Sequence, residues 1–182
     1  MLDWFAHIFV YPEQKIGIFP ILQGDTGTGK SLILNLIKNM IGSNKCGFTN
    51  NAKDQVFGSF NPILSGKVFI EIAELDFLAT KGLEGKFKSL ITDEQITINN
   101  KGVKERSEQS YHRFIATTND DIPIKISKND RRILLIEGCN SKKGDVEYFE
   151  KLDTLIKSKD LQKQFYNFLI SRDTIFKSPA EA

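Results

Sequence analysis

The run Gly24-Asp25-Thr26-Gly27-Thr28-Gly29-Lys30-Ser31 constrains the fold of this chain more than any other stretch. It matches the pattern G-x-x-x-x-G-K-[S/T], which is typical of a phosphate-binding loop between a strand and a helix. An apolar run of strand length, residues 16–22, comes directly before it. Residues 31–41 follow with apolar side chains at helical spacing, and Gly42 is a candidate C-cap. A chance match in a glycine-rich turn would lack these flanks, so we expect a strand, a phosphate-binding loop and a helix in succession.

Strand-like and helix-like segments alternate along the rest of the chain. Residues 2–10 have apolar groups at helical spacing and stop before Pro12. The remaining segments are three apolar runs of strand length and one long amphipathic stretch that reads as one or two helices: residues 68–73, 113–118, 132–137 and 146–170. Strands that alternate with helices predict an α/β fold around a parallel sheet.

Composition narrows the class of protein further. The 182 residues, 40% of them hydrophobic, suffice for one domain over residues 1–182, which no repeat or linker divides. Because the net charge is only +2, any contact with nucleic acid must come from a local basic cluster. Cys46 and Cys139 lack zinc-site spacing, which favours a reduced, cytoplasmic setting. No apolar run reaches the ~18 residues of a membrane span, and no signal peptide precedes Trp4.

The residue types in the phosphate-binding loop indicate how it would hold a nucleoside triphosphate. Glycines at 24, 27 and 29 allow backbone N–H groups to point at phosphate oxygens, and the following helix adds its positive dipole end. Lys30 would reach the β- and γ-phosphates, and the Ser31 hydroxyl would bind Mg²⁺. Residues 24–31 are therefore the predicted site for ATP and Mg²⁺.

Hydrolysis also needs a carboxylate at a neighbouring strand end, to hold Mg²⁺ and polarise water. The segment VFIEIAELD supplies Glu71, Glu74 and Asp76. Strand alternation places Glu71 inside the strand, where an ion pair at a sheet face is its expected role. Glu74 falls just past the last apolar residue, at the end where phosphates bind. We therefore predict Glu74 as the general base and a metal ligand, with Asp76 as a helper.

A polar residue ends the strand in HRFIATTND. The amide of Asn119 could orient the attacking water beside the γ-phosphate. Asparagine also favours turns by bonding its own backbone, so the residue by itself leaves both interpretations open.

A hairpin with a basic tip is expected between the two strands just described. Ile96 and Ile98 alternate with a threonine, and Asn99-Asn100-Lys101-Gly102 makes a turn. Lys101, Lys104 and Arg106 could contact the backbone of a nucleic acid. Exposed lysines on a hairpin are more often simply solvated, so charge alone does not decide their role.

The order of these parts resembles that of superfamily 3 helicases. The resemblance rests on GDTGTGKS, VFIEIAEL, LKSLITDEQITINNKGV, FIATTN and DRRILLIE, and extends over about residues 2–137. The sequence is most similar to the helicase half of viral and plasmid primase-helicases of the poxvirus type. Many members have Asp-Glu where this chain has Ala73-Glu74, which leaves one carboxylate there for the metal.

The resemblance implies a fold, an assembly and roles for single residues. The fold would be a P-loop NTPase of the AAA+ type: a three-layer sandwich with a mainly parallel five-stranded sheet, a β-hairpin insertion and C-terminal helices. In such helicases the hairpin points into the channel of a hexameric ring, so Lys101, with Lys104 second, would grip single-stranded DNA. Asn119 matches the polar sensor. Arg132, or Arg131 in its place, matches the arginine finger that reaches a neighbour's nucleotide, the alternative being a surface ion pair.

The function implied is an ATP-dependent DNA helicase motor, carried in a longer chain together with a primase or polymerase domain. Two alternatives stay open from the residues. One is a non-motor P-loop ATPase that loads or assembles a replication complex, which would bind ATP and DNA without unwinding a fork. The other is a small-molecule P-loop kinase, for which the chain shows no obvious lid over an acceptor.

Overall fold

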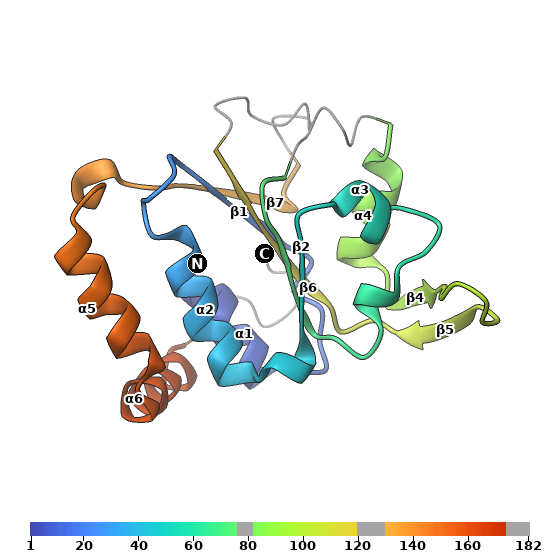
Figure 1. Ribbon diagram of the computed structural model, residues 1–182. Coiled ribbons are helices and arrows are strands. Elements are labelled where there is room, and N and C mark those ends of the chain that lie inside the picture. Colours follow the sequence, from blue (N-terminus) through green and yellow to red (C-terminus); the bar gives the residue numbers. More distant parts are fainter. Residues whose placement is uncertain (76–81, 120–129, 174–182) are drawn as a thin grey trace.

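A five-stranded parallel sheet forms the centre of the computed structural model of the chain (Figure 1). The structure describes residues 1–75, 82–119 and 130–173. The strands follow the order β2-β3-β6-β1-β7, and every neighbouring pair is parallel. Their bounds are Phe19–Gln23 for β1, Cys46–Thr49 for β2, Phe69–Ile72 for β3, Arg113–Thr118 for β6 and Ile133–Glu137 for β7.

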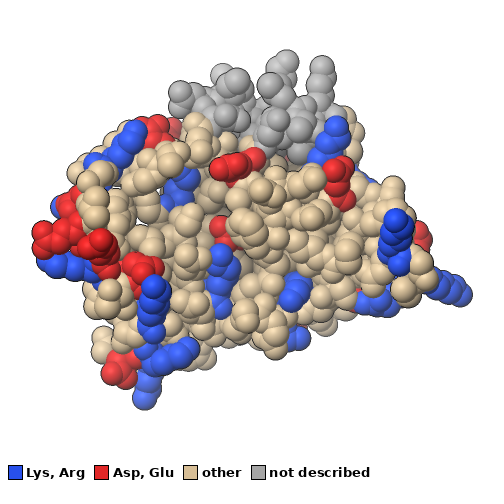
Figure 2. Space-filling view, in the orientation of Figure 1, with Lys and Arg blue, Asp and Glu red and all other residues tan. Residues whose placement is uncertain are grey.

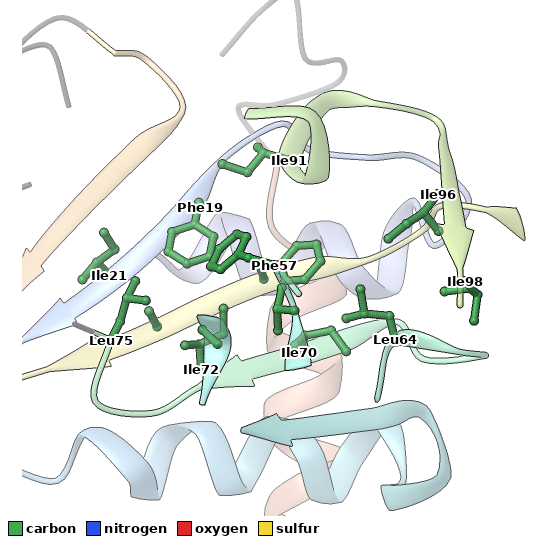
Figure 3. Close-up of a cluster of buried hydrophobic side chains, with 14 residues drawn as sticks. Phe19, Ile21, Phe57, Leu64, Ile70, Ile72, Leu75, Ile91, Ile96 and Ile98 are labelled. Atoms are coloured by element: carbon green, nitrogen blue, oxygen red, sulfur yellow. The ribbon is translucent and has the colours of Figure 1, made fainter. Parts of the chain in front are cut away.

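Alternating side chains give this sheet two buried faces, which explains why its central strands read as nearly continuous apolar runs. Along β1, Phe19 and Ile21 join one hydrophobic cluster while Leu22 joins the other. Figure 3 shows the first cluster, in which side chains from β1 and β3 meet side chains from the helices and the hairpin on that side. Two apolar faces require two covering layers, so the sequence pattern leads to a three-layer sandwich.

Helices α1, α2 and α6 contribute to the cluster on one face, and α3 and α4 to the cluster on the other. Helix α5 packs against α2 and α6. The indole N–H of Trp4 donates to the carbonyl oxygen of Ile18 at 3.0 Å, which fixes α1 beside the start of β1. The helices span Leu2–Val10 (α1), Lys30–Ile41 (α2), Ala52–Gln55 (α3), Glu84–Thr92 (α4), Val146–Lys157 (α5) and Lys159–Ile170 (α6).

A two-stranded antiparallel hairpin extends from the side of the molecule that carries α4 (Figure 1). It consists of β4 (Gln95–Ile98) and β5 (Arg106–Gln109). Asn61 fixes it to the body: its side chain donates to the Thr97 carbonyl at 3.0 Å and accepts from the Asn99 N–H at 2.8 Å. The two hydrogen bonds of the Asn61 amide therefore tie β4 to the body of the domain.

These elements confirm the predicted α/β sandwich, with its mainly parallel five-stranded sheet, hairpin and C-terminal helices. The helix at 2–10 and the strand at 113–118 have the predicted bounds. The strand predicted from residue 16 begins only at Phe19, after Gly17 adopts a φ of 68°. The stretch 146–170 forms two helices because Ser158 ends α5 and caps α6, accepting from the Leu161 N–H at 3.4 Å.

Among the α-helices and strands of the described residues, three lie outside the sequence prediction, namely β2, α3 and α4. None of the helices in the described part of the chain is long and apolar enough to cross a membrane.

Candidate active site

The loop of residues 24–31, here called the glycine loop, joins the carboxyl end of β1 to the start of α2. Gly24 and Gly29 have φ angles of 152° and 87°. A Cβ on Gly29 would lie 2.9 Å from Cε1 of Phe149, and one on Gly24 would lie 3.3 Å from Cα of Gly138. The positive φ disfavours a side chain at both positions, and at Gly29 the Phe149 ring also leaves no room for one, so both glycines suit this loop.

Lys30, the first residue of α2, turns its ammonium group back over the loop. Nζ donates to the carbonyl oxygens of Gly24 and Asp25, the latter at 2.8 Å. It also donates to Oδ1 of Asn119 at 2.9 Å. Partial burial lowers the pKa of Lys30, while the nearby Asp25 charge opposes that shift. A cation is thus held where the motif requires one.

Asn119 reaches Lys30 because of the strand order. It follows β6, which lies between β1 and β3, and the three strands are parallel. Their carboxyl ends therefore meet at one edge, which we call the loop edge of the sheet. The sequence prediction of a polar group beside the phosphate site thereby gains a geometric basis, since Asn119 lies 89 residues from Lys30 and still bonds to it.

Glu74 stands at the same edge, two residues after the end of β3, with an exposed side chain. Its φ of 51° makes it the one non-glycine residue in the described ranges with a positive φ. The N–H groups of Glu74 and of Leu75 donate to Oγ1 and to the carbonyl oxygen of Thr117, at 3.4 and 2.9 Å, which ties this bend to β6. A left-handed glutamate costs free energy and is frequent where function fixes the backbone.

Of the other two acidic residues in this segment, the structure describes Glu71 alone. Glu71 forms an ion pair with Lys38 of α2 at 2.6 Å, and its side chain is only 3% exposed. The predicted structural role of Glu71 is therefore confirmed. Asp76 lies outside the described residues.

Two residues that the sequence prediction missed bind the rim of the glycine loop. The Lys143 ammonium lies 2.7 Å from Oδ2 of Asp25, and the Asn140 amide donates to the same oxygen at 3.2 Å. These contacts lower the pKa of the Asp25 carboxyl, the hydrogen bond from Lys143 being the main cause. Asn140 and Lys143 lie 115 and 118 residues from Asp25 in the sequence. No local pattern could have indicated them.

Arg131 and Arg132 lie at the opposite edge, directly before β7. Because β7 runs parallel to β1, about 16 Å of strand separates them from the loop edge. Arg132 pairs with Asp130, its Nη1 lying 3.1 Å from Oδ1, and Asp130 is only 7% exposed. Arg131 is exposed. Neither guanidinium can reach the glycine loop of its own chain.

The hairpin carries its basic residues in two different states. Lys101 and Lys104 are exposed in the turn between β4 and β5. Figure 2 shows blue side chains at the end of the molecule where Figure 1 places this hairpin. Arg106 is engaged by its own protein, with Nη2 2.6 Å from the Ser65 hydroxyl and 2.7 Å from Oε1 of Glu108. The two lysines are thus the free cations of this turn, and Arg106 holds the hairpin in place.

The donors at the loop edge fit a magnesium ion that shares its ligands with phosphate. Ser31 and Glu74 supply one hydroxyl and one carboxylate, both exposed. Within the described ranges, no group of three or more His, Cys, Asp or Glu residues could hold a metal by itself. Mg²⁺ usually takes one or two protein oxygens and completes its shell with water and phosphate, which suits such a set.

The fold and the glycine loop define a P-loop NTPase-like domain. The chain belongs to the family of unknown function DUF5906, whose model matches residues 22–132. It is 32% identical over 152 residues to the protein named DNA primase-polymerase of Nitratiruptor phage NrS-1. This alignment covers 81% of this chain and 20% of that protein. The chain therefore spans about one fifth of the length of this curated relative.

Two solved structures share the fold. The apo structure of the NrS-1 C-terminal region (305–718) aligns with a TM-score of 0.77 at 24% identity, covering 99% of this chain and 42% of that one. The X-ray structure of JCV helicase aligns with a TM-score of 0.56 at 13% identity, covering 98% and 51%. The sequence relation to the phage primase-polymerase confirms the predicted resemblance to the primase-helicase group, and both solved structures confirm the predicted fold.

Proposed function

We propose that this chain is the ATP-dependent motor domain of a DNA helicase that serves the replication of a virus, phage or mobile element. Residues 1–182 would form one motor domain of a longer chain that also carries a primase or polymerase domain. The motor would act on single-stranded DNA in the cytoplasm of a host cell. The name of the curated relative, DNA primase-polymerase, supports this setting.

The hydrogen bond from Lys30 to Asn119 is the observation that carries the proposal. It links the glycine loop to the end of β6. Strand β6 lies beside β3, and Glu74 follows the end of β3. Lys30 would bind the β- and γ-phosphates of ATP, and Asn119 would orient the attacking water. Glu74 would accept the proton of that water.

Mg²⁺, held by Ser31 and Glu74, would supply charge neutralisation on the phosphate oxygens. Residues 24–29 would add backbone N–H groups around the same phosphates.

The position of the arginines supports a ring of subunits. Arg132, with Arg131 as the alternate, lies about 16 Å of strand away from its own loop edge, so as an arginine finger it would act on another subunit's nucleotide. Closed rings present one subunit's surface to the next, which is the arrangement such a finger needs. We therefore propose a ring, with six subunits as in the helicases that the sequence resembles.

The insertion point of the hairpin suggests how hydrolysis would reach DNA. The hairpin lies in the chain between β3 and β6, whose carboxyl ends lead to Glu74 and Asn119. Strand β6 begins shortly after the hairpin and ends next to Asn119, so a change at the loop edge would pass along this strand to the hairpin that carries Lys101 and Lys104. Phosphate contacts by these lysines would grip one DNA strand in the channel of the ring.

ATP hydrolysis by variants at the loop edge tests this function. Lys30→Ala should abolish ATP binding, because the phosphates lose their cation. Glu74→Gln should bind ATP and lose hydrolysis, because an amide cannot accept the proton of water. Glu137→Gln is the matched control: it removes an exposed carboxylate at the end of β7, at the same edge, and should stay active. Equal ATPase rates for Glu74→Gln and the unaltered chain would remove Glu74 from the role of base.

Unwinding of a forked duplex separates a motor from a loading factor. The unaltered chain should separate the strands with ATP, and the Glu74→Gln variant should not. ATP hydrolysis and DNA binding without unwinding would favour the loading factor. Phosphorylation of a small acceptor without DNA would favour a kinase.

A further inference from the structure

The glycine loop carries a carboxylate, which works against the binding of an anion. Asp25 is the second residue of the loop, and its side chain is 49% exposed. Its backbone carbonyl accepts from Lys30 and from the Thr28 hydroxyl, so the residue sits within the loop itself. A negative charge this close to a triphosphate would repel it within the Debye length of about 8 Å at physiological salt.

Lys143 neutralises that carboxylate from a distant part of the sequence. Its ammonium lies 2.7 Å from Oδ2 of Asp25, and Asn140 donates to the same oxygen at 3.2 Å. Both residues belong to the connection between β7 and α5.

Two further contacts hold the connection between β7 and α5 against the glycine loop. The N–H of Gly138 donates to the carbonyl of Gln23 at 2.6 Å, directly before the loop. Further on, the Phe149 ring lies against Gly29, so closely that a methyl group on the glycine would collide with it. In Figure 1 the orange segment from β7 to α5 accordingly runs beside the start of α2. The position of Lys143 is therefore set by packing on both sides of it.

We propose that Lys143 is a positioning residue of the nucleotide site, which screens Asp25 from the phosphates and so raises the affinity for nucleoside triphosphates. This inference rests on the proposed function. The Asp25–Lys143 pair is about half exposed on both sides, and such pairs contribute little to folding. Its effect therefore falls on anion binding, and Lys143→Gln should fold normally.

Two adjacent lysines provide a matched test. Lys143→Gln leaves Asp25 without its cation. Lys142→Gln removes the same charge one residue away, where the ammonium pairs with Asp145 at 3.0 Å and lies over the Tyr148 ring. The dissociation constant for a fluorescent ATP analogue and for inorganic triphosphate is measured at low and high salt. Thermal unfolding of each variant reports whether it folds.

We expect Lys143→Gln to weaken both ligands about three- to tenfold at low salt, an estimate for one exposed charge acting on a triphosphate through water. Lys142→Gln should change them less than about twofold, and Lys143→Arg should keep the affinity. Asp25→Asn should restore affinity to Lys143→Gln, because no carboxylate is left to screen. The difference between the two glutamine variants should shrink at high salt.

Equal affinities of the two glutamine variants, with a triphosphate bound normally by the unaltered chain, would overturn the inference and leave the proposed function standing. A loss that persists after Asp25→Asn would also overturn it, because Lys143 would then contact the nucleotide directly. No binding by the unaltered chain, with the same result for Lys30→Ala, would overturn the proposed function and this inference with it.

Discussion

Replacing Arg132 by alanine should remove ATP hydrolysis while leaving nucleotide affinity nearly unchanged. An arginine finger stabilises charge on the γ-phosphoryl group in the transition state and contributes on the order of 10³–10⁵ in rate. The five residues of β7, about 16 Å of strand, keep Arg132 away from its own glycine loop, so in the proposed ring this contribution would come from a neighbouring subunit. A loss of that size in the ATPase rate, with less than about a twofold change in the dissociation constant, is the expected result.

A mixture of two inactive variants makes the trans action measurable. An Arg132→Ala subunit has an intact pocket, and a Glu74→Gln neighbour has an intact finger. In rings assembled at random from equal amounts, a pocket is competent when it belongs to an Arg132→Ala subunit and receives its finger from a Glu74→Gln neighbour. This holds for about one quarter of all pockets. The mixture should therefore recover up to roughly a quarter of normal activity, if pockets work independently, and only under conditions where subunits associate.

The ion pair of Arg132 requires its own control. Asp130 is nearly buried, so Arg132→Ala leaves its carboxylate with the Arg132 N–H at 3.0 Å and without the guanidinium. Asp130→Asn breaks the same pair and keeps the arginine. If both variants lose thermal stability and activity together, the pair is structural and the finger assignment fails. Assembled mixtures that stay inactive would refute it as well, whereas the predicted loss in Arg131→Ala instead would move the role to that residue.

Two further predictions concern the hairpin and the buried histidine. Lys101→Ala should weaken binding to single-stranded DNA and lower the salt slope by about 0.7, since one phosphate contact is lost, while basal ATP hydrolysis persists; Lys151→Ala in α5 is the exposed control, and an unchanged slope would exclude the tip as the grip. His7 is 1% exposed, and neither ring nitrogen has a hydrogen-bond partner among the residues that the structure describes; burial first, then Arg113, lowers its pKa from 6.5 to about 4. A lowered pKa means that the unfolded chain takes up the proton first, so stability is full above pH 6.5 and falls by about 3 kcal/mol by pH 4. His7→Leu should flatten that part of the pH profile of chemical unfolding, and an unchanged profile would show that His7 is not its source.

Local chemistry explains which parts could be predicted from the sequence. The glycine loop was predictable because its signal is the spacing of glycine, lysine and serine within eight residues. The role of Glu71 was predictable because strand alternation alone decides which face of the sheet its side chain lies on. The hairpin was predictable because Ile96 and Ile98 alternate with a threonine before a turn. Strand β2 was missed because its four residues, CGFT, have no apolar run, and its strand conformation depends on pairing with β3.

Contacts between distant segments explain the rest. Lys143 and Asn140 bind Asp25 across more than a hundred residues, and each is an ordinary surface residue in its own sequence context. Asn119 left two interpretations open for the same reason, since only the strand order places it beside Lys30. The break at Ser158 was readable, because a serine followed by Lys-Asp-Leu is a normal N-cap, although an unbroken helix fits the apolar pattern equally well.

The hydrogen bonds of Lys30 have a thermodynamic consequence for any phosphate that binds this loop. An ammonium group has three N–H donors, and here the carbonyls of Gly24 and Asp25 and the amide of Asn119 take one each. Binding is then an exchange of acceptors, in which a phosphate oxygen must displace one oxygen that the protein already supplies. The free energy of phosphate binding would then be the difference between two sets of charge-assisted bonds, which would keep the affinity moderate even though each bond is strong. A site of this kind can release a bound phosphate, because the displaced protein oxygen can again accept a hydrogen bond from the Lys30 ammonium.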